Sequence, residues 1–268
     1  MSGPDAFANL PATPRMPALF VGHGTPMNAI KDNRFSRTWR EIGRTLPRPH
    51  AILCVSAHWV TRGTALVHVG QQPKTIHDFG GFPAELYAQQ YPAPGAPEAA
   101  KAVIDLVQSV PVQADTEWGL DHGAWSVLVH WFPAADIPTF QLSLDLSRSP
   151  AEHFDLAREL KPLRDKGVLI VGSGNIVHNL RAMWPDTPPY SWAEAFDADL
   201  TTKLEAGDFR AAADYQALGE IARLSHPTVE HYLPVLYPLG AADEKDRLEF
   251  FNVGFDLASL SMRSFILR

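Results

Sequence analysis

Residues 167–178 read Gly167-Val168-Leu169-Ile170-Val171-Gly172-Ser173-Gly174-Asn175-Ile176-Val177-His178. A short run of Val, Leu and Ile between glycines is typical of a strand that is buried on both faces. Two other apolar runs also end at a histidine, since residues 17–22 lead to His23 and residues 51–57 lead to His58. Ligands of an open α/β sheet bind at the carboxyl ends of its strands, so three imidazoles delivered there predict a metal site.

The segments around these runs alternate between strand and helix patterns, which predicts an α/β fold. Further strands are expected at 64–69 and 138–144, with weaker candidates at 248–253 and 260–267. Helices are expected at 36–46, at 97–109, after the cap Asp121, at 150–166, and from the cap Thr228 to about Leu239, where Gly240 ends it. We expect one domain with a predominantly parallel or mixed central sheet flanked by helices, and the last two strands as an antiparallel edge.

Length and composition limit how the chain can be organised. Its 268 residues, 46% of them hydrophobic, are enough for one large core. Residues 1–15 are rich in Pro and Ala and lack the basic start and apolar centre of a signal peptide. We therefore expect a flexible N-terminal lead at 1–15 and a single domain at 16–268. No apolar stretch approaches the roughly 20 residues that span a bilayer.

Charge and cysteine content exclude several classes of protein. The formal net charge of −7 argues against nucleic acid and against anionic membrane surfaces as partners. Cys54 is the single cysteine, which excludes an internal disulfide and a multi-cysteine metal site. These observations favour a cytoplasmic protein with no nucleic-acid and no membrane partner.

Two more histidines stand where a site residue is expected. His231 follows Glu230 in the expected first turn of the Thr228 helix, where adjacent side chains point about 100° apart, so one of the two should reach a given metal. His122 follows Asp121 at an expected helix start, where the helix dipole favours a neutral imidazole that can move a proton. The plain alternatives are a structural histidine and an ordinary first-turn acid.

The loop at 70–96 is long, and loops of this length are usually functional or disordered. Its aromatic residues predict the wall of a pocket. His77 and Asp78 in this loop are candidates for contact with a substrate, and a solvated pair is the alternative.

The signatures of several common chemistries are missing. The turn at 172–174 could cradle a phosphate, but neither G-x-x-x-x-G-K-[ST] nor G-x-G-x-x-G is present. Ser173 lacks the G-x-S-x-G elbow of a nucleophilic serine, and no H-E-x-x-H helix occurs.

Seven motifs, taken in order, are similar to those of one enzyme family. They are Met16-Pro17-Ala18-Leu19-Phe20-Val21-Gly22-His23-Gly24-Thr25-Pro26-Met27, Ser56-Ala57-His58-Trp59, Ile76-His77-Asp78-Phe79-Gly80-Gly81-Phe82-Pro83, Tyr91-Pro92-Ala93-Pro94-Gly95, Leu120-Asp121-His122-Gly123-Ala124-Trp125, Gly172-Ser173-Gly174-Asn175 with Val177-His178-Asn179, and Pro227-Thr228-Val229-Glu230-His231-Tyr232-Leu233-Pro234. Together they resemble the 4,5-DOPA dioxygenase extradiol family, which belongs to the LigB-type, class III extradiol ring-cleavage dioxygenases. The resemblance spans residues 16–267.

This resemblance implies a non-haem divalent metal held by His23 and His58. His178 matches a position that is either a further metal ligand or the acid/base histidine above the substrate. His231 matches the last histidine of a four-histidine zinc site, and Glu230 is the alternative because the wider class uses a glutamate as an iron ligand. Fe(II) is expected for activity, because Zn(II) has no redox chemistry and would be a bound or substituted metal.

The activity implied by the resemblance is ring opening of a catechol, such as DOPA, with O2 to give a muconic semialdehyde-type product. His178 or His122 would take a proton from the bound catechol. Trp59, Phe79 and Phe82 are candidates to hold the aromatic ring, and packing in the core is their alternative role.

Two other functions fit the same histidines. A zinc hydrolase would use metal-bound water as its nucleophile, and its reaction would continue without O2. A non-catalytic metal-binding protein would fill every coordination position with protein atoms. Beyond the catechol and O2, we expect a monomer or a small homo-oligomer.

Overall fold

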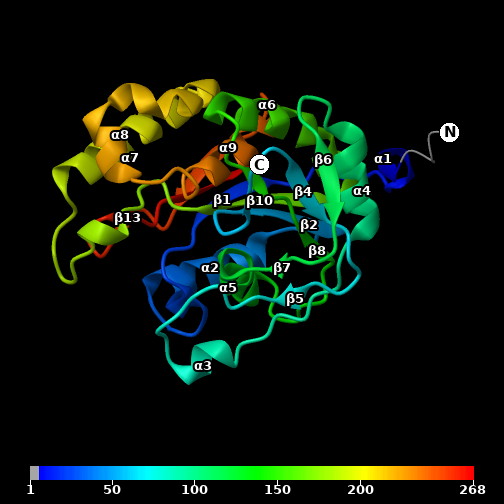
Figure 1. Ribbon diagram of the computed structural model, residues 1–268, viewed down its shortest axis with the longest axis horizontal. Helices are drawn as coiled ribbons and strands as arrows, with labels where there is room; N and C mark the ends of the chain where they lie inside the picture. Colours follow the sequence, from blue (N-terminus) through cyan, green and yellow to red (C-terminus); the bar gives the residue numbers. More distant parts are fainter. Residues whose placement is uncertain (1–5) are drawn as a thin grey trace.

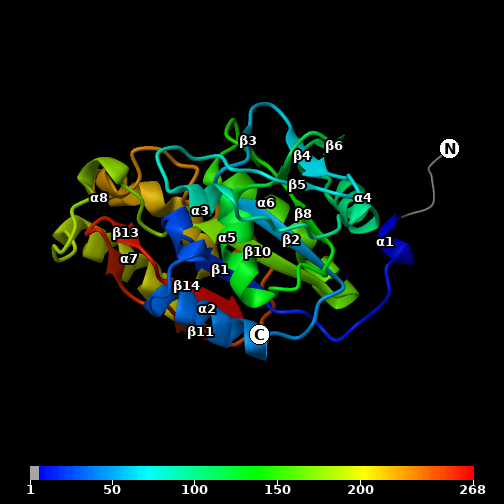
Figure 2. The same ribbon diagram turned by 90° about the horizontal axis from the view of Figure 1, so that it is seen from below.

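A six-stranded sheet forms the centre of the fold. The computed structural model describes residues 6–268 (Figure 1). The strand order is β11-β14-β1-β10-β2-β8, and the labels follow this order in Figure 2. β1 (Ala18–Gly22), β10 (Val168–Gly174), β2 (Ala51–Ser56) and β8 (Thr139–Gln141) pair in parallel. β14 (Ser264–Leu267) pairs antiparallel with both β1 and β11 (Leu248–Phe251). The predicted mixed sheet with antiparallel last strands is therefore confirmed.

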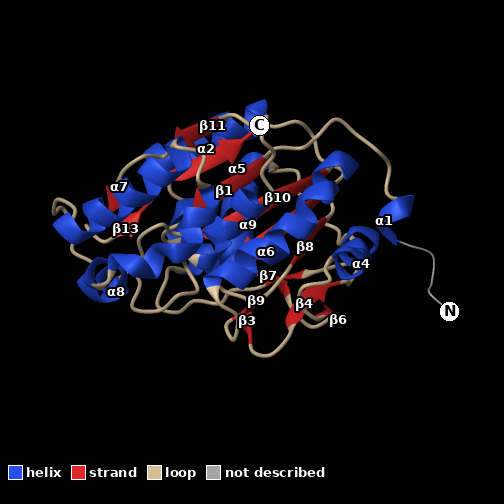
Figure 3. Cartoon of the chain, turned by 90° about the horizontal axis from the view of Figure 1, so that it is seen from above, coloured by secondary structure: helices blue, strands red, loops and turns tan. Residues whose placement is uncertain are grey.

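Helices cover both faces of this sheet. α2 and α5 pack together on the face turned to the viewer in Figure 2, and α6 and α9 pack together on the opposite face, in front in Figure 3. The α-helices are α1 (Ala6–Asn9), α2 (Arg34–Thr45), α3 (Ala84–Tyr87), α4 (Pro97–Leu106), α5 (His122–Trp131), α6 (Pro150–Leu160), α7 (Ser191–Glu205), α8 (Glu220–Ser225) and α9 (Leu236–Gly240). The 3₁₀ turns are η1 (Pro26–Ala29), η2 (Lys161–Lys166), η3 (Leu180–Ala182), η4 (Phe209–Leu218) and η5 (Leu233–Val235).

The central strands are buried on both faces, as their continuous apolar runs predict. Along β10, Ile170 belongs to the core beneath α6 and α9, whereas Leu169 and Val171 belong to the core beneath α2 and α5. Alternate residues of a strand point to opposite faces, so each strand contributes to both cores. This double burial holds the strand ends, and the residues that follow them, in fixed positions.

Four short strand pairs lie outside the main sheet. They are β3 (Val60–Thr61) with β9 (Leu144–Asp145), β4 (Ala65–His68) with β6 (Val112–Asp115), β5 (Lys74–Thr75) with β7 (Gly119–Leu120), and β12 (Phe255–Asp256) with β13 (Leu260–Ser261). The expected strand at 138–144 is therefore β8 followed by the start of β9, and these two pair with different strands. The loop at 70–96 contains β5 and α3.

The helix predicted to start at Thr228 is wrong. Residues 226–232 form turns, and helical structure begins with η5 at Leu233 and continues as α9. Proline in a helix interior removes a backbone hydrogen bond and clashes with the preceding turn, but it is tolerated in the first turn. Pro234 occupies the first turn of η5, so the helix starts where the proline allows it.

The N-terminal lead expected at 1–15 falls partly on residues 1–5, which lie outside the described residues. Of the rest, α1 packs against α4, and Arg15 lies 2.9 Å from Asp165 and 2.6 Å from Asp243. Within residues 6–268, no helix is long and apolar enough to cross a membrane.

Candidate functional site

Two strand ends bring His23 and His58 together. β1 and β2 both lie beside β10 in parallel, with Gly22 opposite Gly174, so the strand ends are nearly level. His23 follows β1 directly, and His58 follows β2 by two residues. Their Nε2 atoms lie 3.1 Å apart. A divalent metal, which sits about 2.0–2.1 Å from an imidazole nitrogen, fits between two such atoms.

The start of α5 adds a third imidazole. Asp121 caps this helix by accepting a hydrogen bond from the Ala124 backbone N–H, as the sequence predicts. His122 is the first residue of the helix, and its ring centroid lies 3.9 Å from that of His58. One ligand atom each of His23, His58 and His122 lies within 4.8 Å of the others.

A second group of ligand atoms consists of His178, Glu230 and His231, again within 4.8 Å of one another. The rings of His178 and His231 are stacked, with their centroids 3.4 Å apart and an angle of 3° between the ring planes. The His231 ring centroid also lies 5.0 Å from that of His58 and 5.6 Å from that of His23. The two groups therefore form one cluster of five imidazoles and a carboxylate.

Glycines in β10 allow His231 to reach this cluster. A Cβ atom at Gly174 would lie 2.2 Å from the His231 carbonyl oxygen, and one at Gly172 would lie 2.0 Å from the Pro234 carbonyl oxygen. The backbone of residues 231–234 can therefore pack directly on the strand, where the Asn175 N–H donates to the His231 carbonyl. The glycines serve this close approach, and no phosphate-binding turn is needed to explain them.

Asp78 fixes two rings of the cluster. Its Oδ2 accepts a hydrogen bond from His122 Nδ1 at 2.9 Å and lies 3.2 Å from His58 Nδ1, and its Oδ1 accepts from the His122 backbone N–H. Burial raises the pKa of this carboxyl, but the hydrogen bonds and charges of the two histidines outweigh burial and lower it overall. An ionised carboxylate only accepts hydrogen bonds, so each Nδ1 that faces it carries the proton.

His231 and His23 are oriented in the same way. His231 Nδ1 donates to Glu230 Oε1 at 3.1 Å, and His23 Nδ1 lies 3.0 Å from Ser173 Oγ. A protonated Nδ1 leaves the lone pair on Nε2, which is the atom available to bind a metal. Oxygen partners on the far side of the ring are what metal-binding histidines usually have.

Burial keeps four of the clustered imidazoles neutral near pH 7. Burial lowers the pKa of His23 and His231 well below the ordinary value, and neighbouring imidazoles lower it further. Burial also lowers the pKa of His58 to about 3 and that of His178 to about 4. Neutral imidazole is the form that binds metal.

This donor set fits a divalent transition metal. His23 and His58 direct Nε2 lone pairs at each other across 3.1 Å, an arrangement that a cation between them stabilises. Imidazole nitrogen is a ligand for Zn, Cu, Fe and Ni, whereas Mg and Ca prefer oxygen. His23, His58, His122, His178 and His231, with Glu230, are the residues that could hold it.

The aromatic loop lies against the cluster at Phe79. The Phe79 ring centroid is 5.6 Å from that of His122 and 5.3 Å from that of Phe82. His77 lies behind Phe79 and its Nε2 is 2.9 Å from the Gln89 carbonyl oxygen. Trp59 is buried and stacks on Trp118, with ring centroids 5.5 Å apart. Of the four predicted substrate residues, Phe79 thus makes ring contact with the histidines.

Sequence reasoning missed the partners that orient these rings. Asp78 was predicted only as a candidate substrate contact, and Ser173 stood out only as a serine without a nucleophile motif. A polar residue next to an expected pocket residue was the one available signal for Asp78. Beneath the site, the buried Asp121 accepts hydrogen bonds from Ser56 Oγ at 2.7 Å and from Gln141 Nε2 at 2.8 Å, which no local pattern indicates.

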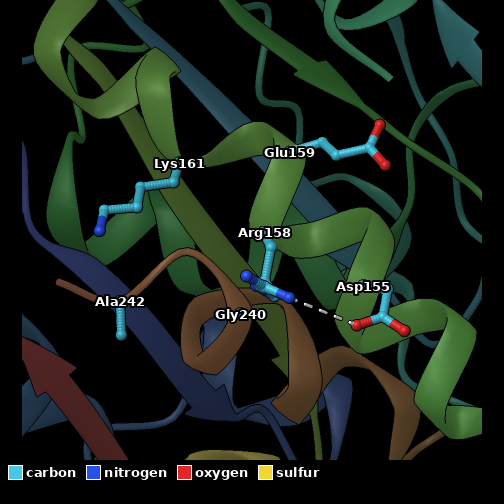
Figure 4. Close-up of a pocket in the computed structure, with 6 residues that line it drawn as sticks. All are labelled: Asp155, Arg158, Glu159, Lys161, Gly240 and Ala242. Atoms are coloured by element: carbon cyan, nitrogen blue, oxygen red, sulfur yellow. Dashed lines mark ion pairs between the residues drawn. The ribbon is translucent and has the colours of Figure 1, made fainter. Parts of the chain in front are cut away.

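A separate hollow lies on the outer side of α6 and α9 and has a volume of about 480 Å³. It is lined by Asp155, Arg158, Glu159, Lys161, Gly240 and Ala242 (Figure 4). Arg158 lies 3.9 Å from Asp155, and Lys161 lies 2.9 Å from Asp243. These charges neutralise each other, and none of the clustered histidines lines this hollow.

Comparison with known proteins places this geometry in a family. The chain is 49% identical over 259 residues to the 4,5-DOPA dioxygenase extradiol of Escherichia coli (strain K12), covering 93% of this chain and 94% of the relative. It is 40% identical over 259 residues to the protein of the same name from Beta vulgaris, covering 92% and 94%. The crystal structure of an uncharacterized protein from Escherichia coli K12 superposes with a TM-score of 0.82 at 43% identity, covering 95% of this chain and all of that chain.

Residues 13–262 match the family described as the catalytic LigB subunit of aromatic ring-opening dioxygenase. This match extends over nearly the whole chain and includes every histidine of the cluster. The chain therefore belongs to the LigB family of aromatic ring-opening dioxygenases, and it is an enzyme of the extradiol type.

Proposed function

We propose that this enzyme opens the ring of a catechol, such as DOPA, with O2 and forms a muconic semialdehyde-type product. The single observation that carries this proposal is the cluster of imidazoles at the strand ends beside the aromatic Phe79. Both oxygen atoms of O2 enter the product, so the reaction needs no added reductant. The names of the relatives support a catechol of the DOPA type.

His23, His58 and His231 hold the metal through Nε2 in this proposal. The three ring centroids lie within 5.6 Å of one another. Glu230 orients His231, because its Oε1 already accepts from His231 Nδ1 and from Thr228 Oγ1. Fe(II) is the proposed metal, since it supplies redox chemistry and open positions for catechol and O2, which Zn(II) would not do.

His178 is the proposed acid/base residue. Among the described residues, no group hydrogen-bonds to its ring nitrogens, and its side chain is only half-buried. Its neutral imidazole can take a proton from a catechol hydroxyl and return it to the product. Because His178 stacks on His231, the proton acceptor stays beside the metal-binding face.

His122 serves as a second proton-handling residue in this proposal. Asp78 holds its Nδ1–H at 2.9 Å, so Nε2 can accept a hydrogen bond from a substrate hydroxyl. Phe79 lies against the His122 ring, and we propose that it packs on the catechol ring and excludes water from it. Phe82, Trp59 and His77 would support this wall from behind.

Oxygen uptake tests the proposal. Protein prepared without oxygen and loaded with Fe(II) should consume O2 when DOPA or another catechol is added and should give a yellow semialdehyde. His23→Ala should lose both the metal and the activity, whereas the exposed His50→Ala should keep both. An iron-loaded enzyme that consumes no O2 with any catechol would refute the proposal.

The same protein preparation can also test the alternative function, a zinc hydrolase. Ester hydrolysis by the zinc-loaded protein that continues without O2, and is lost in His23→Ala, would favour hydrolysis over ring opening. The cytoplasmic location and the monomeric or small homo-oligomeric state stay predictions.

A further inference from the structure

Ser173 lies on β10 between the two glycines that admit the 231–234 backbone, and it is completely buried. Its hydroxyl meets two groups that come from distant parts of the chain. Its Oγ donates to the Gly123 carbonyl at 2.5 Å and lies 3.0 Å from His23 Nδ1. We infer that Ser173 selects the tautomer of His23 that binds the metal, and so acts as a positioning residue for this enzyme.

The number of protons available fixes the direction of both contacts. A serine hydroxyl has one proton to donate, and a backbone carbonyl can only accept. The contact with Gly123 therefore uses the Ser173 proton, and Ser173 Oγ can only accept from His23. His23 must carry its proton on Nδ1, so its lone pair is on Nε2, the atom that faces His58 Nε2 at 3.1 Å.

The other tautomer of His23 is disfavoured for the same reason. If His23 carried its proton on Nε2, its Nδ1 lone pair would face the lone pairs of Ser173 Oγ. The hydroxyl would have to turn away from Gly123 to donate to His23, which leaves the buried carbonyl without this donor. Losing this buried hydrogen bond is unfavourable, so the tautomer with the proton on Nδ1 is preferred.

The position of Gly123 makes this selection possible. It is the second residue of α5, and a Cβ atom there would lie 2.4 Å from Ser56 Oγ and 3.1 Å from His58 Cδ2. Only glycine lets the start of α5 approach β10 and β2 this closely. Ser173 thereby links the peptide next to His122 with the ring of His23, so the two histidines keep their relative positions.

Zinc affinity provides the first test. This inference rests on the proposed metal site, so wild-type protein must first bind Zn(II). Ser173→Ala removes the hydroxyl without adding volume, and we expect zinc affinity, measured by competition with a chelator, to fall about 10–100-fold. The visible spectrum of the cobalt-loaded protein should change as well, and Ser173→Thr, which keeps the hydroxyl, should recover affinity relative to Ser173→Ala.

Ser126→Ala is the matched control. Ser126 lies on α5, is also completely buried, and its Oγ has no hydrogen-bond partner within residues 6–268. The same chemical change there should leave zinc affinity and the cobalt spectrum as in wild type. A folded Ser173→Ala protein that matches Ser126→Ala in both measurements would overturn the inference.

A measurement on the wild-type protein keeps the test independent of any variant's folding. Long-range ¹H–¹⁵N spectra of histidine-labelled, zinc-loaded protein report which ring nitrogen carries the proton. We expect His23 to be protonated at Nδ1, with Nε2 bound to the metal, and protonation at Nε2 would refute the inference. A wild-type protein that binds no zinc would instead contradict the proposed metal site itself.

Discussion

The oxygen group that faces Nδ1 is not the same for all the histidines of the site. His122 and His58 share the Asp78 carboxylate, His231 meets Glu230, and His23 meets the neutral Ser173. A carboxylate partner increases the electron density on the ring and its strength as a ligand, whereas a hydroxyl mainly fixes orientation. The charge of these partners is therefore part of the metal site.

Asp78→Asn should weaken metal binding. The amide keeps the shape of the side chain but replaces one of the two accepting oxygens with an NH2 donor, which would face either the ring N–H or the backbone N–H of His122. We expect zinc affinity to fall about 10–100-fold in a chelator competition. Asp136→Asn is the control, because that exposed carboxylate pairs with Arg48 on the surface. Equal affinity in both variants would contradict the role of Asp78.

His178→Ala should separate proton transfer from metal binding. Loss of a general acid/base typically lowers kcat about 10²–10⁴-fold. Metal content, measured by elemental analysis, should stay at the wild-type level because the other imidazoles remain. A variant that loses its metal would identify His178 as a ligand, and one with unchanged kcat would exclude both roles.

Among the elements, β10 has the largest influence on the site. It lies between β1 and β2, so it sets the spacing of His23 and His58, and its glycines admit the segment that carries His231. The turns at 226–232 replace the helix that was expected there. The segment that follows β10 bonds to this region, since the Asn175 N–H donates to the His231 carbonyl and the His178 N–H donates to the Ser225 carbonyl at the end of α8.

Gly174→Ala should damage both stability and metal binding. The added methyl would lie 2.2 Å from the His231 carbonyl oxygen, so the 231–234 backbone must move away from the strand. We expect a loss of about 1–3 kcal/mol in urea unfolding and a lower zinc affinity. Gly80→Ala is the control, because its new Cβ would meet nothing within 4 Å. Wild-type zinc affinity in Gly174→Ala would show that the close approach is not required.

At the scale of the whole molecule, Arg164 connects segments that are distant in the sequence. Its guanidinium is almost fully buried and donates to the carbonyls of Met16, Ala241 and Leu267 as well as to the carboxylate of Asp246. One side chain thus joins the approach to β1, the end of α9 and the end of β14. These hydrogen bonds lie near the start of β1, at the opposite end of that strand from His23.

Arg164→Met should be strongly destabilising. It leaves Asp246 buried without its cation, and breaking a buried ion pair in this way costs about 3–5 kcal/mol. Arg48→Met removes the exposed partner of Asp136 and should cost far less stability, because solvent screens an exposed ion pair. Urea unfolding of the two variants tests the difference, and similar losses would contradict it.

His153 should make stability depend on pH. Burial lowers its pKa from 6.5 to about 4 in the folded protein. As the pH falls between these values, the unfolded chain takes up a proton that the folded chain does not, so stability decreases by about 3 kcal/mol in total. The stability of the folded protein is unaffected by His153 above about pH 6.5, and the loss caused by His153 grows as the pH falls toward 4.

Chemical unfolding at several pH values checks this prediction. His153→Gln should show a correspondingly smaller loss of stability from about pH 7 to about pH 4. His153 lies on α6, where its Nδ1 faces the Tyr237 hydroxyl and it is not one of the clustered histidines, so metal binding should be unchanged. The same pH slope in wild type and variant would show that His153 does not contribute.

Local patterns predicted the elements that carry the site. The runs before His23, His58 and His178 indicated buried parallel strands, because continuous Val, Leu and Ile have no solvated face. The cap of α5 was also readable, since Asp121 accepts a hydrogen bond from the first turn of its own helix. Patterns failed at Thr228, where a proline and long-range backbone bonds outweighed a local start signal.

By itself, the sequence determined the α/β class, the strands that end in histidines and the family, because these follow from short-range periodicity and from ordered motifs. Only the tertiary structure decided which oxygen faces each imidazole, that Glu230 bonds to His231, and that Ser173 stands between His23 and Gly123. These contacts join residues that are up to 150 positions apart. The chain reaches them through strand order and close glycine packing, which local sequence does not encode.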